Sequence, residues 1–406
     1  MAGSRIGTLL TVLALAGPAV DAQTQSSGQP AVAPSLGQVA QDVESADAGV
    51  RRRALRALRD QGGPETLTLL ARLADDEEHG IRKDAIEAIT RIYVVPPAGE
   101  RPGNVEDVFQ IGPYHVTPWP PSTELVRALT RALADDYPDV RRDAAYAMAI
   151  VSPRPASERA AFELTASLSD RDPAVRIAAA RALGRLGVKS AGVPLVGRVN
   201  DEILDVRLAA MRALGDIRET RAVPALTDQF EFYVRGVAGR AAIDALARIA
   251  DDASVPLFES QSGSGYPAHR RAAYEGLARS RAAKVAASRI DGARGSEGDK
   301  RVRLAMAYAV ASAGSSLAPI VDALADSDLA AQALEYLVEL GPARTADLVA
   351  LLRDHNPVVR RAVATALGFT GGSQAESALA SARQDPDDTV RHAIEIAQLR
   401  IRSAKP

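Results

Sequence analysis

The chain has 406 residues, a formal net charge of −2 and no cysteine, and 47% of its residues are hydrophobic while only 4% are aromatic. The missing cysteines exclude disulfides, thiol catalysis and cysteine-ligated metals. The near-neutral charge provides no general attraction to nucleic acid or to anionic lipid, so we expect neither as a partner. Small aliphatic residues must fill the core, which favours closely packed helices over a sheet.

The first 22 residues are typical of a secretory signal peptide. One basic residue, Arg5, precedes an apolar stretch over residues 6–20, and Ala22 lies at the expected cleavage point. The stretch is short for a membrane span, and an uncleaved N-terminal anchor is the alternative. Residues 23–35 are predicted to be a flexible linker. We therefore expect a periplasmic or secreted protein with no stable membrane span once the signal peptide is removed.

From residue 36 onward the chain repeats one template, which is clearest from Val175 to Gly184 and reads Val-Arg-Ile-Ala-Ala-Ala-Arg-Ala-Leu-Gly. Apolar or small residues fall at template positions zero, four, seven and eight, the spacing of one helical face. Most templates are about thirty residues apart, which is room for two helices and two short connections. The template starts are Val50, Ile81, Val140, Val175, Val206, Ala238, His269, Val302, Leu329, Val359 and Val390.

This period predicts an all-α fold: a right-handed α-solenoid of about eleven stacked two-helix units over residues 36–402. Residues 403–406 are predicted to be a disordered tail. Glycines near the template ends are expected to end the template helices as left-handed caps. These glycines are Gly184, Gly215, Gly314, Gly341 and Gly368.

An aspartate five residues before the template start recurs together with an arginine one residue after it. Six equivalent copies favour a structural ladder over a catalytic row, because an active site is rarely repeated. Each aspartate is expected to accept hydrogen bonds from main-chain N–H groups at a helix start and from arginines of its own or the adjacent unit. The pairs are Asp76 with Arg82, Asp135 with Arg141, Asp170 with Arg176, Asp201 with Arg207, Asp354 with Arg360, and Asp385 with Arg391.

Two-helix units of the form Asp-x-x-x-x-Val-Arg-x-x-Ala-x-x-Ala-Leu-Gly resemble HEAT repeats, in particular the HEAT-like repeats of phycobilisome bilin lyases and related bacterial proteins. The resemblance covers nearly all of the chain after residue 36. It is specific for fold and says little about function. It implies that the template helices line a concave surface.

The resemblance also suggests three enzyme classes with HEAT-like repeats, and the sequence argues against each of them. A deoxyhypusine hydroxylase-like protein would carry His-Glu dyads for iron at template positions two and three, and the chain has no such dyad. A HEAT-like DNA glycosylase would need a basic concave face with aromatic residues, whereas the only tryptophan, Trp119, lies outside the template helices. A bilin lyase-like protein would act in the cytoplasm, which export argues against. We therefore predict no cofactor and no metal.

Residues 93–121 interrupt the period with a proline-rich and aromatic-rich insertion that carries Tyr93, Phe109, Tyr114 and Trp119. Insertions in solenoids often carry binding, but the insertion aromatics could instead pack on the array and cover a seam. Packing is the favoured interpretation. A short strand or hairpin is expected between residues 105 and 116.

Template position six and its neighbours should face the concave side, and the charges there are of mixed sign. Such a face suits a protein or peptide better than a nucleic-acid backbone. The predicted anchors are Arg142, Tyr146, Arg181, Arg185, Arg212, Glu275 and Tyr308. An ordinary solvated face is the alternative. The sequence thus predicts an exported, non-catalytic protein-binding scaffold, with a HEAT-like enzyme or cofactor-binding protein as the alternative hypothesis.

Overall fold

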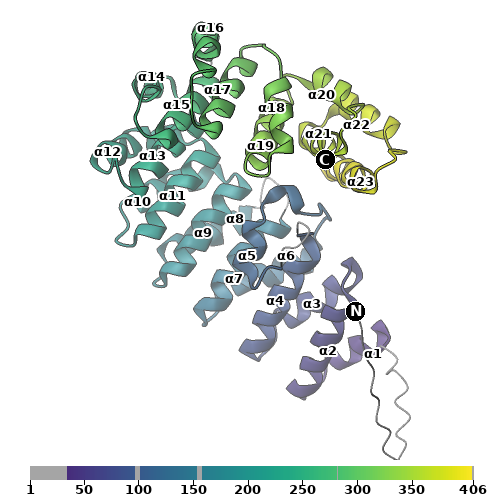
Figure 1. Ribbon diagram of the computed structural model, residues 1–406. Helices are drawn as coiled ribbons and strands as arrows, with labels where there is room; N and C mark the ends of the chain where they lie inside the picture. Colours follow the sequence, from purple (N-terminus) through teal and green to yellow (C-terminus); the bar gives the residue numbers. More distant parts are fainter. Residues whose placement is uncertain (1–33, 97–100, 153–157, 281, 405–406) are drawn as a thin grey trace, which may run out of the picture.

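The computed structural model describes residues 34–96, 101–152, 158–280 and 282–404, and these are all-α (Figure 1). The template segments form one row of helices: α2 (Ala48–Gln61), α4 (His79–Tyr93), α7 (Pro138–Val151), α9 (Pro173–Leu186), α11 (Leu204–Ile217), α13 (Val237–Ile249), α15 (Pro267–Arg279), α17 (Lys300–Ser312), α19 (Ala330–Leu340), α21 (Pro357–Thr370) and α23 (Asp388–Ser403). Eleven predicted templates therefore correspond to eleven helices.

The second row consists of the helices that precede each template helix: α1 (Leu36–Val43), α3 (Leu67–Leu73), α6 (Thr123–Ala132), α8 (Glu158–Ala166), α10 (Gly192–Arg198), α12 (Val223–Phe232), α14 (Val255–Gln261), α16 (Ala283–Arg294), α18 (Ala318–Asp322), α20 (Thr345–Leu351) and α22 (Gly372–Ser381). The two rows run in chain order through the molecule (Figure 1). The predicted α-solenoid of stacked helix pairs is confirmed. No helix of the described residues is long and apolar enough to cross a membrane.

The predicted signal peptide and residues 23–33 of the predicted linker lie outside the described residues, as do residues 405 and 406. The first helix begins at Leu36, and α23 continues through Ser403. Ser403, which was assigned to the disordered tail, is therefore helical.

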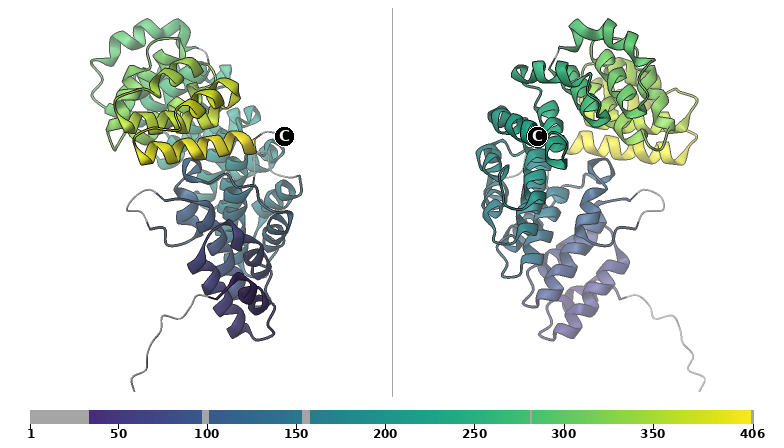
Figure 2. Two further views of the ribbon diagram at one scale, coloured as in Figure 1. Left: turned by 90° about the vertical axis from the view of Figure 1, so that its right-hand side faces the viewer. Right: turned by 60° about the vertical axis from the view of Figure 1, so that its left-hand side comes forward.

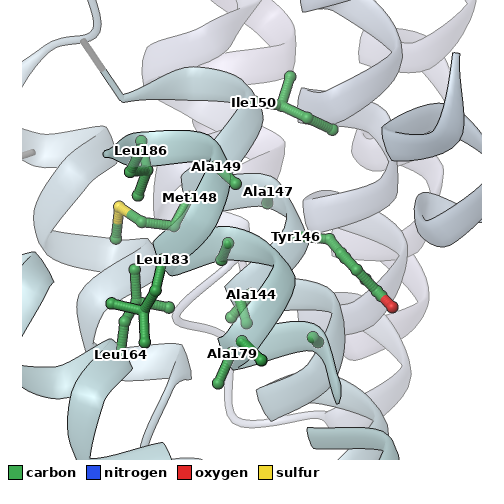
Figure 3. Close-up of a cluster of buried hydrophobic side chains, with 14 of the residues drawn as sticks. Ala144, Tyr146, Ala147, Met148, Ala149, Ile150, Leu164, Ala179, Leu183 and Leu186 are labelled. Atoms are coloured by element: carbon green, nitrogen blue, oxygen red, sulfur yellow. The ribbon is translucent and has the colours of Figure 1, made fainter. Parts of the chain in front are cut away.

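Small residues allow neighbouring template helices to approach closely. Ala144 of α7 and Ala179 of α9 are fully buried, and Figure 3 shows Met148, Leu164, Leu183 and Leu186 filling the space beside them. Tyr146 projects to another side of the same helix (Figure 3). An alanine-rich seam of this kind buries apolar surface with little side-chain entropy to lose.

Most of the template glycines are contact residues, and the predicted capping role was wrong for them. Gly184 lies inside α9, where an added Cβ would be 2.8 Å from the Cα of Ala213. Gly368 inside α21 would meet Ala397 at the same distance. Gly215 is likewise internal to α11, and Gly341 has a φ of −48°. Of the five, only Gly314 has a positive φ.

The aspartate and arginine residues form a ladder that joins each unit to the next. Arg141 donates from Nε and Nη2 to Asp170 of the following unit at 2.7 and 2.9 Å. Its Nη1 donates to the main-chain carbonyl of Asp135, the aspartate of its own unit. The Asp135 carboxylate in turn accepts from Arg82 and from the Tyr137 N–H. The same inter-unit pairs form between Arg51 and Asp76, Arg176 and Asp201, and Arg360 and Asp385.

The ladder has gaps where the template departs from its pattern. Arg207 bonds the Asp201 carbonyl, but its buried Nε has no hydrogen-bond partner among the described residues, because Tyr233 occupies the place of the next aspartate. Asp354 accepts from the Asn356 N–H, and Ala330 occupies the arginine place of the unit before it. Arg391, in the last unit, bonds the Asp385 carbonyl.

The array curves so far that its last units return to the insertion. Views of the molecule from two sides show α23, in yellow, close to helices of the first half of the chain (Figure 2). The rings of Tyr114 and Phe369 meet edge to face with centroids 5.2 Å apart. Arg400 donates to the carbonyl of Val116 at 3.0 Å. These contacts bring together residues that are far apart in the sequence.

Candidate binding site between the insertion and the last repeats

The insertion contains a short helix, and the predicted strand or hairpin over 105–116 was wrong. Helix α5 (Val105–Gln110) starts at Asn104 with a reciprocal capping box to Asp107. Within the part of the chain that the structure describes, strand-like pairing is limited to one antiparallel bridge between Val94 and Val116. The capping box satisfies main-chain donors at the helix start, and Val105 and Val108 are buried, so a helix is the more stable choice.

Helix α5 covers part of the face that was predicted to be concave. The Phe109 ring packs against Tyr146 with centroids 4.9 Å apart, and the Arg185 guanidinium lies over the same ring at 4.8 Å. Arg185 also donates to the Phe109 carbonyl at 3.0 Å. Arg181 donates to Glu106 at 2.6 Å and to the Tyr146 hydroxyl at 2.9 Å. Burial raises the pKa of Tyr146 to about 12.

The later part of the predicted face forms its own polar network. The Tyr336 hydroxyl donates to Glu275 at 2.5 Å, and the Tyr308 hydroxyl donates to Glu339 at 2.7 Å. The two tyrosine rings stack with centroids 4.2 Å apart. Arg279 donates through two nitrogens to Glu339, each at 2.8 Å. The network joins α15, α17 and α19 across the curve of the array.

Three of the predicted partner-binding anchors are therefore corrected. Tyr146, Glu275 and Tyr308 are each less than a tenth exposed, and their polar atoms bond within the protein. They cannot contact a partner unless the protein opens. Arg142 is half-buried against Asp143, and Arg212 remains exposed beside Asp216. The structure thus leaves little of the predicted face free.

A large cavity lies instead between the insertion and the last repeats. Its volume is about 1560 Å³. One wall is Pro113 and residues 116–121 of the insertion, including Trp119, and a second wall is α6 with the C-terminal ends of α7 and α9. The ends of α21 and α23 form the third wall, with Phe369 and Arg400. Residues from three distant parts of the chain therefore share one hollow.

Trp119 is the insertion aromatic that lines the cavity, and Tyr93 and Tyr114 pack against its lining residues. Tyr93 is buried and meets Trp119 edge to face at 6.0 Å. Burial raises the pKa of Tyr93 to about 12, since the ionised phenolate would be poorly solvated there. Tyr114 contacts Phe369 at the base of the third wall. The four predicted insertion residues thus pack on the array, while Trp119 also faces the cavity.

The charged side chains of the cavity wall are mostly arginines. Among the described residues, Arg127, Arg131, Arg159, Arg185 and Arg400 line it, with Glu163 as the single carboxylate. Arg131 is paired outside the wall with Asp75 at 2.8 Å. The remaining excess of positive charge, set among apolar side chains, favours an anionic group in the cavity.

Sequence reasoning identified one wall of this site and missed the other two. Trp119 and Tyr114 stood out by their aromatic and proline-rich context. Phe369 and Arg400 lie at the ends of α21 and α23 and carry no local signal, because they become wall residues only through the curvature of the array. Within the described residues, no group of three histidine, aspartate or glutamate side chains is arranged to hold a metal ion.

No curated protein matches the chain. Similar solved structures include an engineered protein (19% identity, covering 90% of this chain and 98% of its own, TM-score 0.42). The complex of CpcE and CpcF of phycocyanin lyase from Nostoc sp. PCC7120 is 18% identical over 74% of this chain and 98% of its own, with a TM-score of 0.40. A designed armadillo repeat protein in complex with the peptide (KR)4 is 19% identical over 60% of this chain and 98% of its own, with a TM-score of 0.36.

The family description HEAT repeats matches residues 13–94, 161–238 and 315–398. Together these segments cover more than half of the chain. They include template helices from both ends of the array, α2 and α4 at the start and α21 at the end. The chain belongs to the HEAT repeat family.

Proposed function

We propose that the protein is an exported, non-catalytic scaffold that binds another polypeptide and holds an extended segment of it in the cavity. The observation that carries the proposal is the cavity of about 1560 Å³ between the insertion and the last repeats. Pockets for small molecules usually measure about 300–1,000 Å³, so this space suits several residues of a chain better than a metabolite.

The chemistry of the walls supports a polypeptide ligand. Trp119 and Phe369 offer aromatic surface for apolar side chains, and arginines among them offer donors for carbonyls and carboxylates. Most of the face first expected to bind is covered by α5 or engaged in internal hydrogen bonds and ion pairs. The cavity is therefore the better candidate, and it keeps the predicted partner class, a protein or peptide, while it moves the site.

Export and the lack of catalysis remain parts of the proposal that the sequence supports. Residues 1–22 have the charge and apolar pattern of a signal peptide, and no His-Glu dyad occurs in the chain. The alternative of an enzyme or cofactor-binding protein is favoured by no arrangement that we found among the described side chains.

The single tryptophan makes the proposal directly testable, because Trp119 lies in the cavity wall. Peptides that bind the protein without its signal peptide are first selected from a displayed library of short random sequences. Each selected peptide is then titrated into the protein, and binding is followed by the fluorescence emission of Trp119 and by calorimetry. The double variant Ala134→Phe with Ala404→Phe fills the cavity from just beyond the C-terminal ends of α6 and α23, and we expect it to lose binding.

Ala380→Phe is the matched control, since Ala380 is an exposed residue of α22 that does not line the cavity. It should bind like the wild type. If peptides bind without any change in Trp119 emission and the filled variant still binds them, the cavity is not the site.

A further inference from the structure

Arg400 differs from the other arginines that the fold encloses. Arg176, Arg360 and Arg279 each place two nitrogens on a carboxylate of another repeat unit. Arg400 instead donates from Nη2 to the Val116 carbonyl at 3.0 Å, and its guanidinium carbon lies 3.9 Å from the centroid of the Phe369 ring. It forms no ion pair with any carboxylate in the part of the chain that the structure describes.

This environment is unfavourable for a cation, because burial removes water and no carboxylate replaces it. Burial lowers the pKa of Arg400 to about 10, so the side chain is still charged at neutral pH. The face of the Phe369 ring offsets part of this unfavourable free energy through a cation–π interaction with the guanidinium. The Val116 carbonyl uses only one of the five guanidinium N–H donors, which leaves donors for a ligand.

The groups that share the wall with Arg400 do not neutralise it. Arg127, Arg159 and Arg185 are cations as well, and Glu163, on α8, forms no ion pair with Arg400. An anionic ligand in the cavity would therefore meet an excess of positive charge. One of these charges, Arg400, is partly desolvated and lies among the apolar residues of the cavity. A polypeptide carries its negative charge on carboxylates, which match the planar guanidinium fork.

We infer that Arg400 is the anchor for a carboxylate of the bound polypeptide, either the C-terminal carboxylate or an aspartate or glutamate side chain, with neighbouring apolar residues packed on Trp119 and Phe369. This inference rests on the proposed function and adds the chemical group that the site selects. The carboxylate supplies in the complex the partner that the fold supplies to Arg176 and Arg360.

The test compares three pools of short, mostly apolar peptides on the wild-type chain. The first pool has a free C-terminal carboxylate, the second is the same pool amidated, and the third is amidated with one internal glutamate. We expect the amidated pool to bind about ten- to a hundredfold more weakly than a carboxylate pool, the loss typical of a charged hydrogen bond. Preference for the first or the third pool tells which carboxylate Arg400 takes.

Variants then assign the preference to one residue. Arg400→Gln should remove the difference between the pools, and Arg400→Lys should keep a reduced part of it because the charge remains without the fork. Arg402→Gln is the matched control, since Arg402 lies on the same helix, is exposed and does not line the cavity. Thermal melts and the emission of ligand-free Trp119 check that each variant keeps its fold.

The outcomes separate the two proposals. Equal binding of the acid and amidated pools to the wild type would overturn the role of Arg400 and leave polypeptide binding standing. A preference that survives in Arg400→Gln would do the same, because another arginine would then be the anchor. If no pool binds, while laurate as a small carboxylate probe does, both the inference and the proposed function fail.

Discussion

A ladder arginine can bond a main-chain carbonyl of its own unit and the carboxylate of the next unit at once, because its guanidinium is planar and carries several donors. In Arg176, Nη1 donates to the Asp170 carbonyl of its own unit, while Nε and Nη2 donate to Asp201 of the next. Arg207 occupies the same template position and forms only the first kind of bond, because Tyr233 replaces the next carboxylate. The same residue type at equivalent positions therefore contributes differently to stability.

We expect Arg176→Met to destabilise the protein by about 3 kcal/mol, because Asp201 would remain buried without its main partner. Arg207→Met should cost about 1 kcal/mol, the value of hydrogen bonds to a main-chain carbonyl, since no carboxylate depends on it. Urea unfolding of the two variants followed by circular dichroism measures the difference. Equal shifts of the midpoint would show that the inter-unit pair contributes nothing.

At the scale of helices, glycine and alanine at the template ends determine how closely neighbouring units stack. An added Cβ on Gly184 would lie 2.8 Å from the Ala213 Cα, a distance at which the helices must move apart. The sequence pattern Ala-Leu-Gly looks like a helix end, but α9 continues past Gly184 to Leu186 and is capped by Gly187, which has a φ of +71°. The pattern alone does not distinguish a cap from a contact, because both require the absence of a side chain.

Gly184→Ala should therefore lower stability by about 1–3 kcal/mol through overpacking between α9 and α11. Gly197→Ala is the control, because Gly197 lies in α10 with nothing within 4 Å of the added Cβ. It should raise stability by up to about 1 kcal/mol, as expected for glycine in a helix. Thermal melts of both variants provide the comparison, and a stable Gly184→Ala would contradict the close-contact interpretation.

The sequence of the insertion carries a local signal for the helix α5, although a strand was predicted there. Asn104 and Asp107 have the spacing of a capping box, which marks the start of α5. The valines at 105 and 108 were interpreted as part of a strand, although their spacing of three also fits one helical face. The aromatic content correctly identified the segment as special, but not whether its rings would contact Tyr146, Trp119 or the distant Phe369.

At the scale of the whole molecule, the ladder and the curvature act together. The ladder connects units in series, so its carboxylates are distributed from Asp76 to Asp385. The curvature brings α23 to the insertion, where the Arg400 contact to Val116 spans most of the chain. Stability and the candidate site therefore depend on the same stack.

Acid should weaken this stack. Hydrogen bonds from Arg360 and Arg270 lower the pKa of Asp385 and Glu297 in the folded protein. A carboxyl group with a lowered folded pKa stabilises the fold above its unfolded pKa, near 4, and loses that contribution as the pH falls through the folded value. Burial raises the pKa of Asp143 and Asp244, so protonation of these two carboxyl groups favours the folded state as the pH falls.

We therefore expect a melting temperature that changes little from about pH 8 to pH 5 and falls below about pH 4, where carboxylates protonate. Asp385→Asn should be less stable near pH 7 and should lose less on acidification, since one titrating group is gone. Calorimetry across this range gives the comparison. If the melting temperatures of the wild type and of Asp385→Asn fell equally on acidification, the Asp385 carboxylate would not contribute to the loss of stability in acid.

The sequence by itself determined the repeat, its helical rows, the number of units and the positions of the ladder residues, because each depends on local periodicity and on contacts between neighbouring units. Only the tertiary structure decided that Tyr146, Glu275 and Tyr308 are buried and that Trp119 shares a cavity with Phe369 and Arg400. Small rotations between units accumulate along a solenoid, so contacts between distant units follow from the summed curvature and not from any local pattern.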